Sequence, residues 1–166
     1  TYSGQVSIKN TSSNEILISA SGELDKSKNA KLLDVNSSAT EITVSEPENA
    51  VDNLEVYIQI PSTFAQELVI ESNSGDVSVE GLSLNLLSIG TSSGTLVLDS
   101  IKADTLSLNT VSGDTRLRNS TITTLSAKSV SGEIEIDNKS SAVTRLKSIS
   151  GDIQLQVPES ESFRFD

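Results

Sequence analysis

The chain alternates apolar and polar residues in short runs, and from residue 75 onward these runs return at a constant interval. A glycine marks each return, and each glycine follows the last by 19 residues: Gly75, Gly94, Gly113, Gly132 and Gly151. The residues two and four positions after each glycine form a pair, such as Val77/Val79 or Ile134/Ile136, which we expect to point into the core. Alternation with a period of two places such a pair on one face of a strand. A constant step with no insertion predicts a solenoid of stacked 19-residue coils.

A second apolar pair follows twelve and fourteen residues after each glycine. Its members are Leu87/Ile89, Leu106/Leu108, Leu125/Ala127 and Thr144/Leu146, and we expect the residues at position seventeen to point inward with them: Ser92, Val111, Val130 and Ile149. A unit this short cannot close its own core, so the units must stack in parallel at about 4.8 Å. The predicted fold class is therefore all-β, a single-domain parallel β-helix with almost no α-helix. We expect right-handed winding, because parallel crossovers are nearly always right-handed, with a left-handed coil of similar length as the alternative.

The boundaries of the domain follow from where this spacing holds. Strand-like runs at 5–9, 16–19, 31–35 and 41–44 do not keep it, so we predict that residues 1–53 form irregular N-terminal strands that cap the stack. The acidic, Pro-containing segment 46–49 reads as a surface loop. Counting back one period from Gly75 places Ile58 and Ile60 in the columns of Val77 and Val79, so regular coils are expected over 54–157. Residues 158–166 form either a C-terminal cap or the start of a further coil, and the whole of 1–166 reads as one domain.

Charge and composition narrow the function classes. The net charge of −11 repels nucleic acid and anionic membranes and favours cationic partners, so we expect no nucleic-acid binding. The chain has no His and no Cys, which removes thiol chemistry, disulfides, His-centred acid–base catalysis and the usual zinc ligand sets. No apolar run approaches the roughly 20 residues needed to span a bilayer. We expect no cofactor, no enzymatic activity and no membrane insertion by this segment, with any signal or anchor outside it.

Two columns at the predicted corner are candidates for a site. The glycine column supplies a left-handed turn or a close backbone approach, which is a structural role. The column after it reads Asp76, Thr95, Asp114, Glu133 and Asp152. Its carboxylates, at Asp76, Asp114, Glu133 and Asp152, are a possible acidic binding column, and stacked carboxylates attract cations such as calcium. Turn capping is the favoured interpretation, because Asp readily accepts hydrogen bonds from neighbouring backbone N–H groups, and we predict no metal site.

Hydroxyl and charge columns accompany the repeat. One row contains only serine, and a second row two residues earlier mixes serine and threonine; they read Ser74, Ser93, Ser112, Ser131, Ser150 and Ser72, Thr91, Thr110, Ser129, Ser148. Flat hydroxyl rows can bind ice, but an all-serine row favours hydrogen bonding to the turn backbone. Asp99, Arg118 and Asp137 succeed one another in one column and Arg116 lies beside Glu135, which predicts cross-strand charge pairs of about 0.2–1 kcal/mol each.

A resemblance to a known family rests on three features. These are the run 54–61 that ends in Pro61, the run 68–79, and the serial Ser-Gly-Asp units that follow. Over about residues 50–166 the chain resembles a bacterial family of β-solenoid domains called adhesins, whose function is unknown. The resemblance implies a domain exported to the cell surface or cell envelope, and it brings no catalytic residue.

These observations predict a non-enzymatic, secreted or envelope-bound β-helical binding module, an adhesin in the sense of that family. The expected partner is an envelope glycan, a host protein or a cationic peptide. Three alternatives remain open: an envelope-stress sensor or decoy that binds cationic peptides, a carbohydrate-active enzyme built on a β-helix, and a structural spacer. We expect a monomer or a weak end-to-end oligomer, because the ends of a solenoid expose unpaired strand edges.

Overall fold

The computed structural model describes residues 4–23, 33–37, 42–45, 52–140 and 143–156, and the regular structure in these ranges is β-strand. The strands are β1 (Gly4–Thr11), β2 (Leu17–Glu23), β3 (Asp34–Ser37), β4 (Ile42–Ser45), β5 (Asp52–Pro61), β6 (Glu67–Glu80), β7 (Ser83–Ser93), β8 (Leu96–Asp99), β9 (Lys102–Ser112), β10 (Thr115–Ser131), β11 (Ile134–Ser140), β12 (Val143–Ser150) and β13 (Ile153–Gln156). In the described part of the chain no helix is long and apolar enough to cross a membrane.

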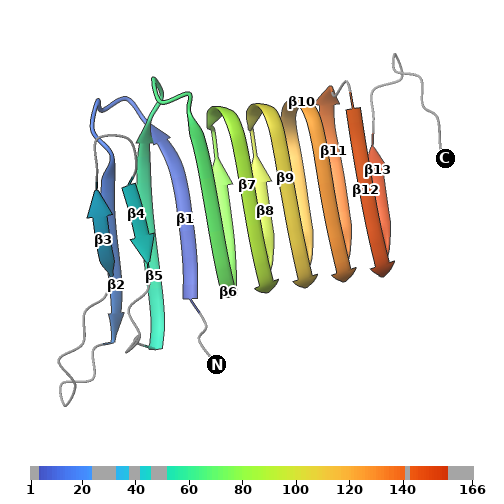
Figure 1. Ribbon diagram of the computed structural model, residues 1–166, viewed down its shortest axis with the longest axis horizontal. Helices are drawn as coiled ribbons and strands as arrows, with labels where there is room; N and C mark the ends of the chain where they lie inside the picture. Colours follow the sequence, from blue (N-terminus) through green and yellow to red (C-terminus); the bar gives the residue numbers. More distant parts are fainter. Residues whose placement is uncertain (1–3, 24–32, 38–41, 46–51, 141–142, 157–166) are drawn as a thin grey trace.

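From β6 to β13 the chain winds into a stack of parallel strands, one coil beside the next (Figure 1). The first apolar column pairs in the predicted order Val77, Leu96, Thr115, Ile134 and Ile153. The second pairs in the order Leu68, Leu87, Leu106, Leu125 and Thr144. The prediction of a β-solenoid with 19-residue coils is therefore confirmed.

The core of the coils is one buried cluster to which both apolar columns contribute. Its best-buried apolar members have a relative exposure of 0%: Leu87, Ile89, Leu96, Leu98, Leu106, Leu117 and Leu125. Because each coil buries such residues only against its neighbours, stacking supplies the stability, at about 1.5–3 kcal/mol for each fully buried aliphatic side chain. The rigid stack fixes every outward column at strand spacing.

The N-terminal strand enters the stack in a place that the spacing did not predict. β1 lies between β5 and β6, with Val6 opposite Val77 on one side and opposite Val56 on the other. The columns of Val77 and Val79 therefore continue to Val56 and Ile58, and the expected assignment of Ile58 and Ile60 is wrong. Counting back one period assumed unbroken stacking, whereas β1 occupies the neighbouring level.

The remaining N-terminal strands close this end of the molecule. β2 pairs antiparallel with β5, and among the described strands β3 and β4 pair only with each other as a hairpin. Figure 1 places this hairpin beside β5, at the end of the stack. The predicted loop at 46–49 and the predicted C-terminal cap or further coil at 158–166 lie outside the described residues.

The structure corrects the predicted inward direction of position seventeen and places the mixed hydroxyl row on the inner face instead. The residues at position seventeen face solvent, with Val111 52% and Ile149 72% exposed, while the mixed hydroxyl row lies inside, with Thr110 only 5% exposed. The reason is parity: positions twelve, fourteen and sixteen share the inner face of one continuous strand, and position seventeen falls on the other face.

Candidate functional site

The glycine column forms a corner at which successive coils almost touch. At Gly94 the backbone has φ +114°, and a Cβ there would overlap the carbonyl oxygen of Gly75 in the preceding coil. The column also extends to Gly4, which pairs with Gly75. Only glycine fits such a close approach, so this corner holds the neighbouring side chains in fixed positions.

Next to the glycines, two aspartates bind the backbone of the following coil. Asp76 Oδ1 accepts a hydrogen bond from the backbone N–H of Thr95 at 2.8 Å. Asp114 Oδ1 accepts one from the backbone N–H of Glu133 at 3.1 Å. In both cases a carboxylate satisfies a donor of the neighbouring coil, as an aspartate does in a turn.

Ion pairs join the outward charges, within one coil and between adjacent strands. Arg116 contacts Asp114 at 3.2 Å and Glu135 at 3.4 Å, and Arg118 contacts Glu135 at 3.0 Å. At the level of β1, Lys9 Nζ lies 2.8 Å from Glu80, and this hydrogen-bonded carboxylate raises the pKa of Lys9. All these groups are partly or well exposed, so solvent screens each pair and its contribution to stability is small.

Together these side chains form what we call the acidic face. It is the outward side of β1, the second half of β6, β8, the first half of β10, β11 and β13, together with the residues directly before these strands. Its carboxylates belong to Asp76, Glu80, Asp99, Asp114, Glu133, Glu135, Asp137 and Asp152, against the cations Lys9, Arg116 and Arg118. The structure thus brings the four predicted acidic residues into one column, adds a second column with Glu80, Asp99 and Asp137, and places Glu135 between the two. Within the described ranges no group of three or more His, Cys, Asp or Glu side chains could hold a metal ion. The arrangement is an extended negative surface.

A second corner, opposite in the coil, was missed by sequence reasoning. Gly81, Ser100 and Asn119 have φ values of +72°, +57° and +54°, and they recur every 19 residues. Beside this corner the fully buried Ser120 accepts a hydrogen bond from the N–H of Ile101 at 3.1 Å and donates one to the carbonyl of Arg118 at 2.8 Å. The sequence signal for this corner was a column of residues that can adopt left-handed backbone dihedral angles. It is a weak signal, because only one of the three residues is glycine.

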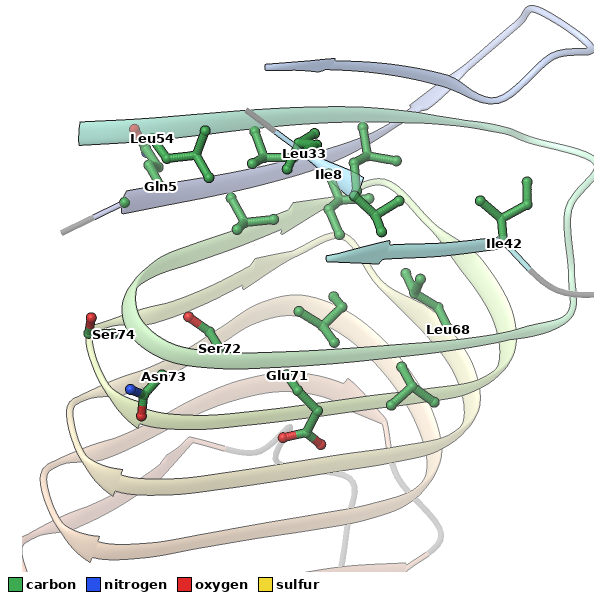
Figure 2. A pocket seen from close by; sticks show the side chains of 17 residues that line it. Gln5, Ile8, Leu33, Ile42, Leu54, Leu68, Glu71, Ser72, Asn73 and Ser74 are labelled. Carbon is green, nitrogen blue, oxygen red and sulfur yellow. The ribbon is translucent and has the colours of Figure 1, made fainter. Parts of the chain in front are cut away.

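The structure also contains a cavity that the sequence did not predict. It has a volume of about 380 Å³ and lies at the N-terminal end of the stack (Figure 2). Its walls are mainly aliphatic: Val6, Ile8, Leu33, Ile42, Val44, Leu54, Val56, Ile58, Leu68, Val69 and Ile70. Gln5 and the polar stretch 71–74 border one side, where Figure 2 shows Ser72, Asn73 and Ser74. The cavity exists because β1 and β6 meet over only half a coil.

These features define a β-solenoid whose coils are fixed by two turn columns and whose outer surface is rich in carboxylates. A family model described as Toastrack DUF4097 matches residues 1–166. The chain belongs to this family of domains of unknown function. A search of curated proteins and a search of solved structures each found no match.

Proposed function

We propose that this protein is a non-catalytic binding module of the bacterial cell envelope, exposed on the outer side, whose acidic face contacts a cationic partner. The observation that carries the proposal is the acidic face itself, where carboxylates outnumber cations and lie mainly in two columns at strand spacing. The resemblance to exported adhesin domains supports the location and the binding role. A glycan or a host protein is the alternative kind of partner for the same surface.

The physics of this face favours many weak contacts over one tight site. Coils repeat at about 4.8 Å, so an extended partner with regularly spaced positive charges meets one carboxylate after another. Exposed charges attract over about 10 Å in 0.1 M salt, and the attraction weakens as salt rises. Arg116 and Arg118 offset Asp114 and Glu135 in the middle of the face, and Lys9 offsets Glu80 at one end. The excess negative charge of the face therefore belongs to its other carboxylates, which include Asp76, Glu133 and Asp152.

A binding experiment with a ten-residue lysine peptide tests this proposal. We expect saturable binding at 20 mM salt that is lost at 500 mM salt. The triple variant Asp76→Asn, Glu80→Gln, Asp152→Asn should bind at least fivefold more weakly, since it removes the exposed ends of the face. The matched control Glu15→Gln, Glu67→Gln, Asp104→Asn removes three exposed carboxylates elsewhere and should bind like the unmodified protein.

Two outcomes would change the conclusion. Equal losses in the triple variant and its control would mean that net charge alone attracts the peptide, which contradicts a specific face. Absence of peptide binding together with salt-tolerant binding to a purified envelope glycan or a matrix protein would favour adhesion in place of a cationic partner.

A further inference from the structure

The side of the coils opposite the acidic face is a sheet of parallel strands. It consists of the first half of β6, β7, β9, the second half of β10, and β12, which succeed one another along the stack (Figure 1). The inward side chains of this sheet and of the acidic face enclose one core, so the two outward sides point away from each other. We call this second outward side the graded face; it consists of the outward residues of 67–73, 86–92, 105–111, 124–130 and 143–149.

The charge of the graded face changes sign along the stack. Its central column pairs in the order Glu71, Gly90, Asn109, Lys128 and Lys147. Glu67 adds a second exposed carboxylate in the first strand, and Arg145 adds a third exposed cation in the last. One end of the face is therefore acidic, the middle has no charged residue, and the other end is cationic.

Within the described ranges, neither group of charges has an opposite charge beside it on this face. Lys128 and Lys147 lie directly opposite each other in neighbouring strands, where like charges repel, and the next residue of their column is Asn109. At the acidic end the Glu71 carboxylate lies over Gly90, which has no side chain to cover it. Opposite charges on the graded face are thus separated by three to four coils, which is roughly 14–19 Å.

Apolar side chains on the graded face are exposed to solvent. Four aliphatic residues are between 43% and 72% exposed: Val69, Val111, Val130 and Ile149. The last three follow one another at 19-residue intervals, so they form one column in successive coils beside the column of the lysines. An exposed apolar column next to unpaired charges is typical of an interaction surface.

Charges of both signs at opposite ends of one face suit a second copy of the same face. We propose that two copies of this chain associate through their graded faces, related by a two-fold axis that runs parallel to the strands at β9. This axis reverses the order of the coils, so the acidic end of each copy lies against the cationic end of the other. A simple anionic or cationic ligand would match one end only. Two-fold dimers are the commonest assembly of soluble proteins, and their interfaces are self-complementary.

The axis determines which residues meet. Positions along the strand are kept and the coil order is reversed, so Glu71 faces Lys147 of the second copy. Lys128 of the second copy faces Gly90, where the Glu71 carboxylate lies. At the axis Val111 packs against Val111 of the second copy. Each carboxylate is thus placed between two cations, and the centre of the interface is apolar.

The area of the graded face indicates a weak dimer. Five strands at about 4.8 Å and seven residues at about 3.3 Å give a face of roughly 24 by 23 Å, or about 1,100 Å² buried on both copies together. Specific interfaces begin near this size, so we expect association only at high protein concentration. The acidic faces lie on the outer sides of such a dimer, and the inference does not depend on the proposed function.

Sedimentation velocity between about 5 µM and 1 mM protein tests the assembly. We expect the mass to rise with concentration toward that of two chains. Val111→Glu places two carboxylates against each other at the axis and should weaken the association at least tenfold. Val97→Glu makes the same change at an exposed valine of the acidic face and should leave the association unchanged.

An exchange of charges identifies the contacting residues. The variant Glu71→Lys and the double variant Lys128→Glu, Lys147→Glu should each stay monomeric, because like charges then face each other. An equimolar mixture of the two should dimerise, since each variant supplies the charge that the other needs at both contacts. Recovery in the mixture also shows that both variants are folded.

Three outcomes would overturn the proposal. The first is a monomer at about 1 mM, or a mixture of the two charge variants that does not associate. The second is an equal loss of association in Val97→Glu and Val111→Glu, which would place the contact elsewhere. The third is a monomer that binds a ten-residue glutamate peptide and loses this binding in the Lys128→Glu, Lys147→Glu variant, which would assign the cations to an anionic partner.

Discussion

Asp114 and Glu133 occupy the same column in successive coils, and the carboxylate of the first accepts a hydrogen bond from the backbone N–H of the second at 3.1 Å. A side chain of one coil thus satisfies the main chain of the next. The acidic column, which at first sight is a row of repelling charges, also fastens the coils to one another.

This contact predicts a stability cost when the acceptor is removed. Asp114→Ala should lower the free energy of unfolding by about 1 kcal/mol, as the loss of a carboxylate that caps a backbone donor does elsewhere. Asp114→Asn keeps an oxygen acceptor and should cost less. Urea denaturation measures both, and Asp104→Ala, which removes an exposed carboxylate, is the control. A cost for Asn as large as for Ala would assign the effect to the ion pair with Arg116.

The glycine corner predicts a sharp contrast between two neighbouring glycines. Gly94→Ala places a Cβ against the carbonyl of Gly75 at a left-handed φ and should destabilise the protein by about 3 kcal/mol or more. Gly90→Ala meets only the end of the flexible, exposed Glu71 side chain, so its effect should stay within about 0.5 kcal/mol. Thermal unfolding of the pair checks the contrast, and similar melting temperatures for the two variants would contradict it.

In the mixed hydroxyl row, which lies on the inner face, we expect two threonine-to-valine substitutions to change the stability in different directions. Thr91 Oγ1 donates a hydrogen bond to the carbonyl of Ser93 at 2.9 Å, whereas Thr110 Oγ1 is buried with no partner among the described residues. Thr91→Val should therefore destabilise by about 1 kcal/mol, and Thr110→Val should be neutral or stabilising, because it removes a buried polar group that no described hydrogen bond compensates. Equal destabilisation by the two substitutions in chemical denaturation would show that Thr110 has a partner of comparable strength.

The stacked architecture predicts graded protection along the rod. Strands β9 and β10 are packed between coils on both sides, while β12 and β13 each have one described neighbour along the stack. Because a solenoid is stabilised by its nearest neighbours, local opening should begin at the C-terminal coil. Native-state hydrogen exchange should find amides of β9 at least tenfold more protected than those of β13. Uniform protection would indicate that the coils unfold only together.

The regular part of the fold could be predicted from sequence because its information is local and periodic. The 19-residue step fixes which residues become neighbours, as the confirmed column from Leu87 to Leu125 shows. The inward position of Thr110 was also encoded in the alternation of the strand. Position seventeen was wrongly predicted to point inward because its apolar residues, Val111 and Val130, were given more weight than the alternation.

The placement of β1 and the cavity could not be obtained by counting residues. Gly4 carries the same local pattern as the later glycines, Gly-Gln-Val-Ser-Ile against Gly-Asp-Val-Ser-Val at Gly75, but 71 residues separate them. Such a long-range pairing leaves two similar motifs in the sequence but no regular spacing that would show that they pair. The cavity depends on that pairing, since it lies where β1 pairs with only the second half of β6.

The insertion of β1 between β5 and β6 has a consequence for the order in which the molecule can form. Both partners of β1 lie downstream, at 55–61 and 75–80, so during synthesis β1 emerges before either of them, can pair with β5 first and gains β6 as its second partner only later. Closing so long a loop is slow compared with adding one coil to the next. The regular coils can wind as they emerge, while the N-terminal strand pairs only with strands that lie far along the chain.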